Sequence, residues 1–582
     1  MARKYGRCAN YGECTLADSH KVIDSTEDNF ICSECGKPLR VASQAASEGG
    51  AVGSKMTMFK WFLPILLFLL IGGAGVAAWQ LWPSSAAQPI TPAVAPSLPS
   101  QVPAPPPQLA TPEPVITPPE IKSEVSPNII LRVHGSNTIG AKLAPALVES
   151  FMKEKGYADI EKVPLADLEV LIKGKKPDSA EVDAVEIKAH GSSTAFDETD
   201  KNKLVGLLGG HADVGMSSSP VKKDMVEKFQ VQNMGNPGSR AQEHVIALDG
   251  LAVIVNPSNS LDKLSVEKIR KIFLGEVTDW AQLGGNSGAI KLYSRDQQSG
   301  TYDTFKHLVL SGQKLECDKQ ANLMCFEDSK ELASHVASDL NGIGFIGLNY
   351  IGTTKALRVS MGEGVNALAP TRFTVKTEDY PLGRRLFLYQ TNQPKPLAAE
   401  FIQFSLSNAG QKVVSDAGLV EVGIDEAITP IARDAIDADK QRLLDDAAVP
   451  KAYKDLIRNA DRKDTQVNFR FASGASELDN RAFRDVGRLS EKLGKPEFEG
   501  AKLILVGFTD PKGDEVKNLD LSKQRATQVK DELAAEGIQV ETVTGFGEEP
   551  SLLLDPREDE PESLAKNRRV EVWLQRSEFP QP

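Results

Sequence analysis

The spacing of apolar positions changes several times along this chain of 582 residues, and each change marks a different kind of segment. Residues 61–81 form an uncharged, almost wholly apolar run. At about 1.5 Å of rise per residue, such a run makes a helix of roughly 30 Å, long enough to cross the hydrocarbon core of a bilayer. Trp61, Trp79 and Trp82 lie at the two ends of the run, where indole rings favour the headgroup region. We predict one transmembrane helix over residues 58–82. The alternatives are a buried core helix and a cleaved signal peptide, but a signal peptide would start near residue 1.

Basic residues predict the orientation of this span. Eight Lys and Arg residues precede the apolar run at 61–81, whereas none lies between Trp82 and Lys122. The positive-inside rule therefore places the N-terminus in the cytosol. We expect a single-pass protein of the cell inner membrane, with its C-terminal domains in the periplasm.

Beyond residue 127, short β-rich runs alternate with turns rich in Gly, Ser and Thr and with helical patterns. The runs 129–133, 184–189 and 290–293 are followed by turns at 134–138, 191–194 and 295–301. After the first turn, apolar residues recur every four positions: Ile139, Leu143, Leu147 and Phe151. Strands that alternate with helices predict an α/β domain over residues 128–425.

These turns also suggest a ligand. A Gly/Ser/Thr turn at a helix N-terminus offers backbone N–H groups, hydroxyl donors and the positive end of the helix dipole, which together suit a tetrahedral oxyanion. One such turn could be an ordinary N-cap. Several in one domain, one of them carrying Arg295, favour an anion site.

The last part of the chain shows a second alternating pattern. We expect strands at 467–471, 503–506 and 570–574, and helices at 483–493 and 521–535. This β-α-β-α-β order predicts a two-layer α+β domain over residues 465–577, with helices on one face of its sheet. Residues 426–464 have a helical pattern and are interpreted as a connector.

Composition excludes some classes of function. The chain is acidic, with 67 Lys and Arg against 79 Asp and Glu, and no basic cluster suggests nucleic acid. No nucleophile, base and orienting group are recognisable together, so we do not expect an enzyme. Residues 83–127 are rich in Pro and Ala, which favours an extended spacer. Residues 42–57 are mostly small or polar and form a predicted tether.

The six cysteines divide at the predicted span. Cys8, Cys14, Cys32 and Cys35 precede it with the spacing C-x5-C-x17-C-x2-C, which indicates a structural zinc site in a ribbon over residues 1–41. His20 is an alternative ligand, but four thiolates complete the shell. The ribbon is expected to dock an unknown cytosolic partner. Cys317 and Cys325 lie on the oxidising side and are expected to form a disulfide rather than a redox pair.

The segment 128–425 resembles the periplasmic phosphate-binding protein (PstS-like) family of ABC transporters. The resemblance includes residues 212–218, 268–275, 278–280 and 342–346, and the arginine loop at 295–301. It implies a type II periplasmic-binding-protein fold with two lobes, phosphate as the ligand and an ABC transporter permease as a partner. The implied ligand-binding residues are Ser136, Thr138, Ser218, Arg295, Ser299, Gly300 and Thr301.

Two departures from this family bear on the ligand. The family's carboxylate acceptor for a protonated oxyanion is replaced by Ser218, and a second aspartate is replaced by Gln297. The loss of a buried acceptor weakens discrimination against fully ionised oxyanions such as sulfate. Phosphate, a related oxyanion and an empty or repurposed cleft therefore remain open, and Asp296 is a candidate substitute.

The segment 465–577 resembles the OmpA C-terminal, peptidoglycan-associated family. Its motifs lie at 507–510, 518–526, 545–548 and 567–570. The resemblance implies that Asp510 and Arg525 bind the diaminopimelate residue of the peptidoglycan stem peptide, with Arg568 in the same pocket. One carboxylate and one guanidinium suit this zwitterion. The alternative is a structural Asp–Arg pair.

Together these patterns predict a membrane-anchored, cell-wall-tethered solute-binding protein. The alternative is an envelope-spanning scaffold or signalling protein, in which the cleft has diverged and the zinc ribbon docks a cytosolic partner.

Overall fold

The computed structural model describes residues 3–8, 22–26, 32, 39–41 and 127–576, with gaps at 178, 180, 197–205, 298, 318, 426–427, 472–476 and 558–560. Near the N-terminus, a three-stranded sheet has the order β2-β1-β3. Its strands are β1 (Arg3–Cys8), β2 (Val22–Thr26) and β3 (Leu39–Val41), and β1 and β2 are antiparallel.

The predicted zinc site and membrane span lie mostly outside the described residues. Cys8 ends β1 and Cys32 is buried, but Cys14 and Cys35 are not described, so zinc stays a prediction. Among the residues that are described, no helix has both the length and the apolar character needed to cross a bilayer. The predicted span at 58–82 is not among them, nor are the tether and residues 83–126 of the linker.

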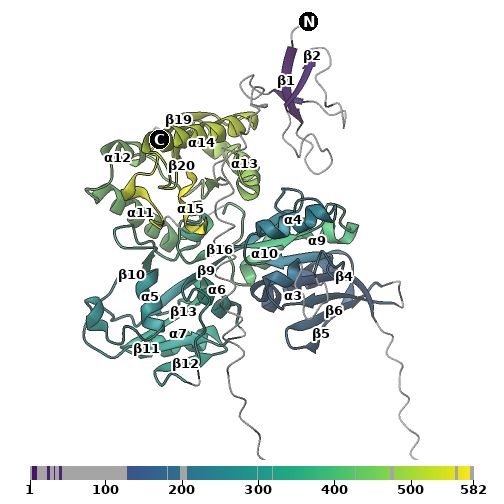
Figure 1. Ribbon diagram of the computed structural model, residues 1–582, viewed down its shortest axis with the longest axis horizontal. Helices are drawn as coiled ribbons and strands as arrows, with labels where there is room; N and C mark the ends of the chain where they lie inside the picture. The colour runs from purple at the N-terminus through teal and green to yellow at the C-terminus, as the bar shows by residue number, and fades with distance from the viewer. Residues whose placement is uncertain are drawn as a thin grey trace, which may run out of the picture. The chain divides into compact units, whose positions relative to one another are not determined.

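One long strand, β9 (Glu243–Val255), is shared by two lobes (Figure 1). Its first part pairs with β16 (Gly383–Tyr389), and its last five residues pair with β13 (Gly342–Gly347). Ile246 accordingly packs in the core of the first lobe, and Val253 in the core of the second. These lobes confirm the predicted two-lobed α/β fold.

The first lobe contains the strand order β9-β16-β8-β4-β7-β6-β5, in which β4 is parallel to β7 and β8. The further strands are β4 (Asn128–Gly135), β5 (Ala158–Ala166), β6 (Glu169–Lys175), β7 (Val182–Lys188) and β8 (Val214–Ser217). The helices are η3 (Ile139–Leu143), α3 (Ala144–Glu154), η4 (Ser192–Ala195), α4 (Lys223–Val231), α9 (Pro396–Leu406) and α10 (Asn408–Asp416). All four apolar positions that predicted the first helix are buried in this lobe.

The second lobe contains the order β12-β11-β13-β9, in which β11 is parallel to both of its neighbours. Its further strands are β10 (Lys263–Ser265), β11 (Lys291–Arg295), β12 (Leu323–Phe326), β14 (Lys355–Ala356) and β15 (Arg358–Ser360). Its helices are α5 (Val266–Phe273), η5 (Trp280–Leu283), α6 (Gly300–Leu308), α7 (Ser329–Ser338), η6 (Leu348–Tyr350) and α8 (Arg372–Lys376). The structure contains a disulfide between Cys317 and Cys325.

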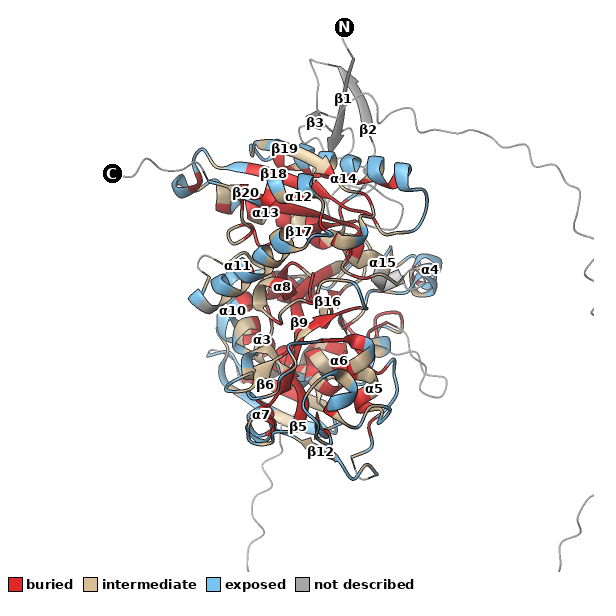
Figure 2. Ribbon diagram, turned by 90° about the vertical axis from the view of Figure 1, so that its left-hand side faces the viewer, coloured by how far each residue is buried: buried red, intermediate tan, exposed pale blue. Residues whose placement is uncertain are grey.

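The C-terminal domain is built on a four-stranded sheet of order β17-β20-β18-β19. The strands are β17 (Asn468–Arg470), β18 (Lys502–Gly507), β19 (Val540–Gly545) and β20 (Arg569–Gln575). The helices are α11 (Pro430–Asp445), α12 (Lys451–Ile457), α13 (Asn480–Leu493), η7 (Pro496–Phe498), α14 (Glu515–Ala535), η8 (Pro550–Leu552) and α15 (Pro561–Asn567). Figure 2 shows that the buried residues gather in the sheets of the two lobes and of the C-terminal domain.

Two expectations for this domain were wrong. Strand β19 was not predicted, because only its last residue is buried and an apolar pattern is therefore missing. The sheet also has helices on both faces. Leu505 and Val572 pack with α13 and α14, whereas Ile504 and Trp573 pack against Tyr453 of α12. The predicted connector is therefore a third layer of the C-terminal domain.

Candidate functional site

The first and third predicted turns meet between the two lobes. Thr138 follows β4, and Ser299 caps the N-terminus of α6 by accepting a hydrogen bond from the Thr301 backbone N–H. A Cβ atom added to Gly300 would lie 2.9 Å from the Cα atom of Thr138, so the two turns are in contact. They line a cavity of about 260 Å³ together with Arg295. Five of the seven predicted residues line this cavity: Thr138, Arg295, Ser299, Gly300 and Thr301.

The second turn lies beside the first, because the Gly191 backbone N–H donates to the Gly135 carbonyl at 2.9 Å. Its Ser192 hydroxyl accepts from the Ser218 backbone N–H at 3.0 Å and lies 3.1 Å from the Ser218 hydroxyl. Ser136 is 1% exposed, and its hydroxyl has no partner among the described residues. Ser136 and Ser218 are therefore not among the residues that line the 260 Å³ cavity, and Ser192 is a further hydroxyl, beside Ser218, that the predicted set omitted.

Arg295 is held by the loop between β12 and α7. Its Nε donates to the Phe326 carbonyl at 3.2 Å, and its Nη1 and Nη2 donate to the Ser329 hydroxyl and the Glu327 carbonyl, each at 2.5 Å. A guanidinium carries five N–H donors, so these three bonds orient the group without using all of them. Burial lowers the pKa of Arg295 from its ordinary value, and nearby carboxylates such as Asp296 oppose this shift.

A second arginine reaches the same place from β16. Arg384 donates from Nη2 to the Thr138 hydroxyl at 2.6 Å, and also to the Thr304 hydroxyl of α6. Its Nε lies 3.5 Å from the carboxylate of Asp249, its register partner on β9. Sequence reasoning missed both residues. The available signal was a charged side chain inside a largely apolar strand at Asp249 of β9, and a pair of arginines directly before an apolar run at Arg384 of β16.

The predicted wall-binding residues converge in the C-terminal domain. Arg568 donates from Nη1 to the Asp510 carboxylate at 3.2 Å and from Nε to the Phe471 carbonyl at 3.3 Å. Arg525, on α14, donates to the Phe508 carbonyl at 3.4 Å, and its guanidinium lies 5.4 Å from the ring centre of Phe471. One carboxylate and two guanidinium groups thus share one place, which is the arrangement expected for binding a zwitterion.

Arg525 is almost inaccessible to solvent, at 1% exposure. Burial, with the nearby positive charge of Arg568, lowers the pKa of Arg525 to about 10. Asp510 opposes this shift, so the pocket contains more positive than negative charge. A ligand carboxylate would compensate the excess.

Comparison with known proteins identifies the domains. A family model of the PBP superfamily domain matches residues 170–409. Protein SphX of Synechococcus elongatus is 31% identical over 269 residues, which cover 40% of this chain and 77% of SphX. The chain belongs to the PBP superfamily. The phosphate-binding protein PstS of Staphylococcus haemolyticus is 29% identical to the PBP domain over 224 residues, which cover 37% of this chain and 67% of that protein.

Two further matches complete the comparison. A phosphate transport receptor from Vibrio cholerae aligns in structure with a TM-score of 0.36 and 22% identity, covering 50% of this chain and 99% of that one. A model of the OmpA family matches residues 470–567, beyond the PBP domain. Residues 426–576 are therefore called the OmpA-like domain below.

The OmpA-like domain is docked on the strands that join the PBP lobes. Glu378 accepts from Arg385 of β16 at 3.0 Å and also pairs with Arg481 of α13. Arg385 in turn pairs with Asp479 at 2.8 Å. Burial alone would raise the pKa of Glu378, but the guanidinium groups of Arg385 and Arg481 hold it well below its ordinary value. Ion pairs therefore cross this junction in a buried setting.

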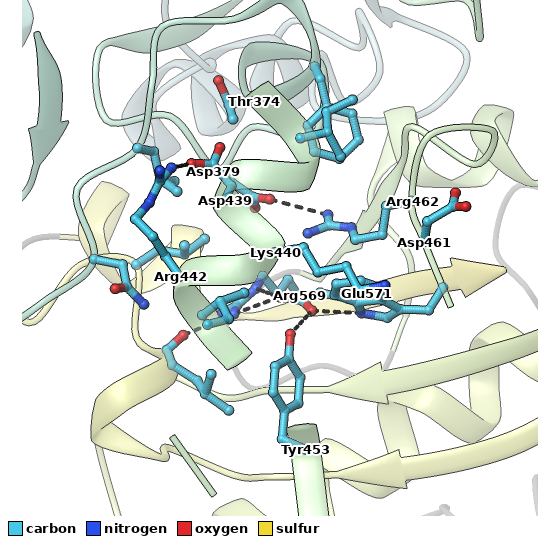
Figure 3. Close-up of a pocket in the computed structure, with 18 of the residues that line it drawn as sticks. Thr374, Asp379, Asp439, Lys440, Arg442, Tyr453, Asp461, Arg462, Arg569 and Glu571 are labelled. Carbon is cyan, nitrogen blue, oxygen red and sulfur yellow. Dashed lines mark hydrogen bonds and ion pairs between the residues drawn. The ribbon is translucent and has the colours of Figure 1, made fainter. Parts of the chain in front are cut away.

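A second group of contacts centres on Asp379. Its carboxylate accepts from Arg462 at 3.2 Å, from Arg470 at 3.2 Å and from Asn468 at 2.6 Å. Beside it lies a cavity of about 80 Å³, in which Glu571 accepts from Tyr453 at 2.7 Å and from Arg569 at 2.9 Å (Figure 3). These contacts make the cavity a feature of the domain junction, although Arg462 Nε, Arg470 Nε and Arg569 Nη1 are buried there without a hydrogen-bond partner among the described residues.

Strand β17 leads from the junction to the predicted wall-binding residues. Arg470, its last residue, contacts Asp379 of the PBP domain, and the next residue, Phe471, accepts the hydrogen bond from Arg568. Arg384 and Arg385 are likewise adjacent on β16, where one contacts the cleft and the other the OmpA-like domain. Successive side chains of a strand point to opposite faces, which explains the arrangement on β16. At the end of β17, Phe471 instead accepts through its backbone carbonyl.

Proposed function

We propose that this chain is a solute-binding protein of the cell envelope, whose PBP domain binds phosphate or a related tetrahedral oxyanion and whose OmpA-like domain binds peptidoglycan. The membrane span at 58–82 and the zinc ribbon at 1–41 belong to the same proposal. They would anchor the chain in the inner membrane and present a docking module to the cytosol. An ABC transporter permease is the partner that a solute-binding protein would supply.

One observation carries the ligand proposal, namely the cavity between the lobes. It is lined by the hydroxyl or backbone groups of Thr138, by the N-terminus of α6 at Ser299–Thr301, and by the guanidinium of Arg295. Hydroxyl donors, helix N–H groups and one fixed cation are what a tetrahedral anion requires. The relative PstS is called a phosphate-binding protein, which is consistent with this chemistry. The name of the other relative, SphX, states no ligand.

Calorimetric titration of the full chain with phosphate and with sulfate tests this proposal. We expect heat with phosphate, and at least a tenfold loss of affinity in Arg295→Ala because the fixed cation is removed, about 1.4 kcal/mol or more. Arg270→Ala is the matched control. Arg270 pairs with Glu267 within α5, and its loss should leave binding unchanged. No heat with any tetrahedral anion would refute the ligand proposal.

The wall-binding proposal rests on the convergence of Asp510, Arg525 and Arg568. Co-sedimentation of the full chain with purified sacculi is expected for the wild type and expected to be lost in Asp510→Ala, because the ligand ammonium would lose its carboxylate partner. Asp520→Ala, at an exposed position on α14, is the control and should co-sediment normally. Co-sedimentation of Asp510→Ala at the wild-type level would refute the assignment of this pocket.

The second candidate function is an envelope scaffold or signalling protein with an unused cleft. It is favoured by the replacement of the family's acceptor carboxylate by Ser218, and by the docking of the OmpA-like domain on β16. The two experiments separate the candidates, since a scaffold would bind sacculi and give no heat with oxyanions.

A further inference from the structure

The OmpA-like domain contacts both lobes of the PBP domain with neighbouring residues of one helix. Asn480 and Arg481 are the first two residues of α13. Asn480 binds the first lobe, whereas Arg481 binds the second. A single rigid element of the docked domain therefore connects the two lobes.

We propose that the docked OmpA-like domain fixes the angle between the two lobes of the PBP domain, because α13 is bound to both of them. In this state the lobes do not rotate against each other about β9, and they become free to do so only when the domain leaves one of them. The inference concerns the lobes themselves and holds for any ligand of the cleft.

The contacts with the first lobe lie at the start of β9. Asn480 Nδ2 donates to the Glu243 carboxylate at 2.8 Å. Glu243 also accepts from the Tyr389 hydroxyl at 2.9 Å, and the Tyr389 ring packs in a core cluster of this lobe. One turn further along α13, Arg484 Nη2 lies 2.8 Å from His244 Nδ1. Two turns of the helix are thus attached to the first lobe.

The contacts with the second lobe involve α8 and the segment that follows it. Arg481 donates from Nη2 to the Lys376 carbonyl at 2.7 Å, and its Nη1 pairs with Glu378. Arg470 of β17 adds an ion pair with Asp379 at 3.2 Å. Arg481 is 3% exposed and Arg470 is 5% exposed. Because removing one partner of a buried ion pair leaves an uncompensated charge, the second lobe resists separation from the docked domain.

Helix α13 cannot follow one lobe alone. Its apolar positions pack in the core of the OmpA-like domain: Ala482, Val486 and Leu489. An α-helix also keeps adjacent residues at fixed relative positions. A rotation of one lobe against the other would therefore draw either Asn480 or Arg481 away from its partner.

A cavity of about 200 Å³ lies at the same junction. Residues of the first lobe, the second lobe and the OmpA-like domain line it, among them Ser219, His307 and Phe471 in that order. The docked domain thus lies across the boundary between the lobes. Two-lobed proteins change shape by hinge rotation at such a boundary, so a domain bound on both sides of it opposes that motion.

Double electron–electron resonance on the full chain, without added anion, tests the inference. Spin-labelled amino acids are incorporated at Lys153 of α3 and Lys330 of α7, which are exposed positions on different lobes. The wild type should give one narrow distribution of interlobe distances. Asn480→Ala/Arg484→Ala, which removes the contacts with the first lobe, should broaden it and shift its mean by more than about 2 Å, the size of a hinge rearrangement.

A second variant acts from the PBP side of the same contact. Arg240 donates to the Leu478 carbonyl at 3.3 Å, and its guanidinium lies 3.9 Å from the ring centre of Phe483. Arg240→Ala should broaden the distribution to a smaller extent, and it serves if the double variant does not fold. A second label pair within the first lobe, at Lys153 and Lys223, should keep its distance in every folded variant.

Arg488→Ala is the matched control, because Arg488 lies on the same helix and pairs with Asp485 of α13 at 2.6 Å. Its interlobe distribution should match the wild type. A distribution that stays narrow in the folded double variant would overturn the inference, as would equal broadening in Arg488→Ala. A distribution that is already broad in the wild type would show that docking does not fix the lobes.

Discussion

Several titratable side chains of this protein are buried where two domains or two lobes meet, and His244 of β9 is one whose protonation matters. It is 3% exposed. Its Nδ1 lies 2.8 Å from Arg484 Nη2 of α13, and its Nε2 lies 3.2 Å from the Ala241 carbonyl. A neutral imidazole fits both partners, because Nδ1 then accepts and Nε2–H donates. Burial and the charge of Arg484 lower the pKa of His244 to about 3.

This shift predicts acid sensitivity. The unfolded chain takes up a proton on His244 near the ordinary pKa of 6.5, whereas the folded chain does so only near 3. Stability is therefore complete above pH 6.5 and falls as the pH decreases from 6.5 toward 3, with a slope approaching about 1.4 kcal/mol per pH unit. Thermal unfolding between pH 7 and 5 should show a flatter dependence in His244→Gln than in the wild type. His190→Gln, at an exposed position, should keep the wild-type slope, and equal slopes for all three proteins would contradict the prediction.

Which binding residues could be predicted depended on how local their signal is. Arg295, Ser299, Gly300 and Thr301 stand in one short loop, so their order along the chain already places them at a helix N-terminus. Asp249 and Arg384 are 135 positions apart and become neighbours only through the pairing of β9 with β16. The spacing of residues along the chain does not reveal which residue of β9 pairs with which residue of β16.

At the scale of elements, the close approach of α6 to the turn after β4 shapes the cleft. Gly300→Ala would place a Cβ atom 2.9 Å from the Cα atom of Thr138, so the two turns would have to separate. We expect the affinity for phosphate to fall roughly tenfold, about 1.4 kcal/mol, with an unchanged circular dichroism spectrum. Gly423→Ala, where an added Cβ meets nothing within 4 Å, is the control and should bind normally. Wild-type affinity in Gly300→Ala would show that the contact does not limit the ligand site.

Apolar spacing predicted the elements that bury one complete face and failed for those that do not. Helix α3 was found because its apolar positions recur every four residues in the lobe core. Helix α14 begins at Glu515, two turns earlier than predicted, because of its first six residues only Asn518 is buried. The helices α11 and α12 were predicted as helical. The apolar spacing did not reveal that they pack on the sheet face opposite α13 and α14.

At the scale of the whole molecule, the PBP and OmpA-like domains share buried ion pairs. In Glu378→Gln, Arg385 and Arg481 lose a common carboxylate, and breaking a buried pair costs about 3 kcal/mol or more. Differential scanning calorimetry should show the two domains melting together in the wild type, and a separate, earlier transition in the variant.

Glu400→Gln is the control for this prediction. Glu400 pairs with Lys155 at the surface of the PBP domain, where an ion pair contributes about 1 kcal/mol at most. Its melting profile should match the wild type. Two resolved transitions already in the wild type would contradict the cooperative junction.

The adjacent arginines of β16 have a consequence for how the two proposed sites are linked. If the OmpA-like domain binds the wall through Asp510, a chain of contacts leads from that residue through Arg568 and Phe471 to β17. It continues from Arg470 of β17 to Asp379 of the PBP domain. Close to this route lies β16, where Arg385 meets the docked domain and Arg384 meets Asp249. The proposed wall contact and the ligand cleft are then joined through two neighbouring residues of one strand.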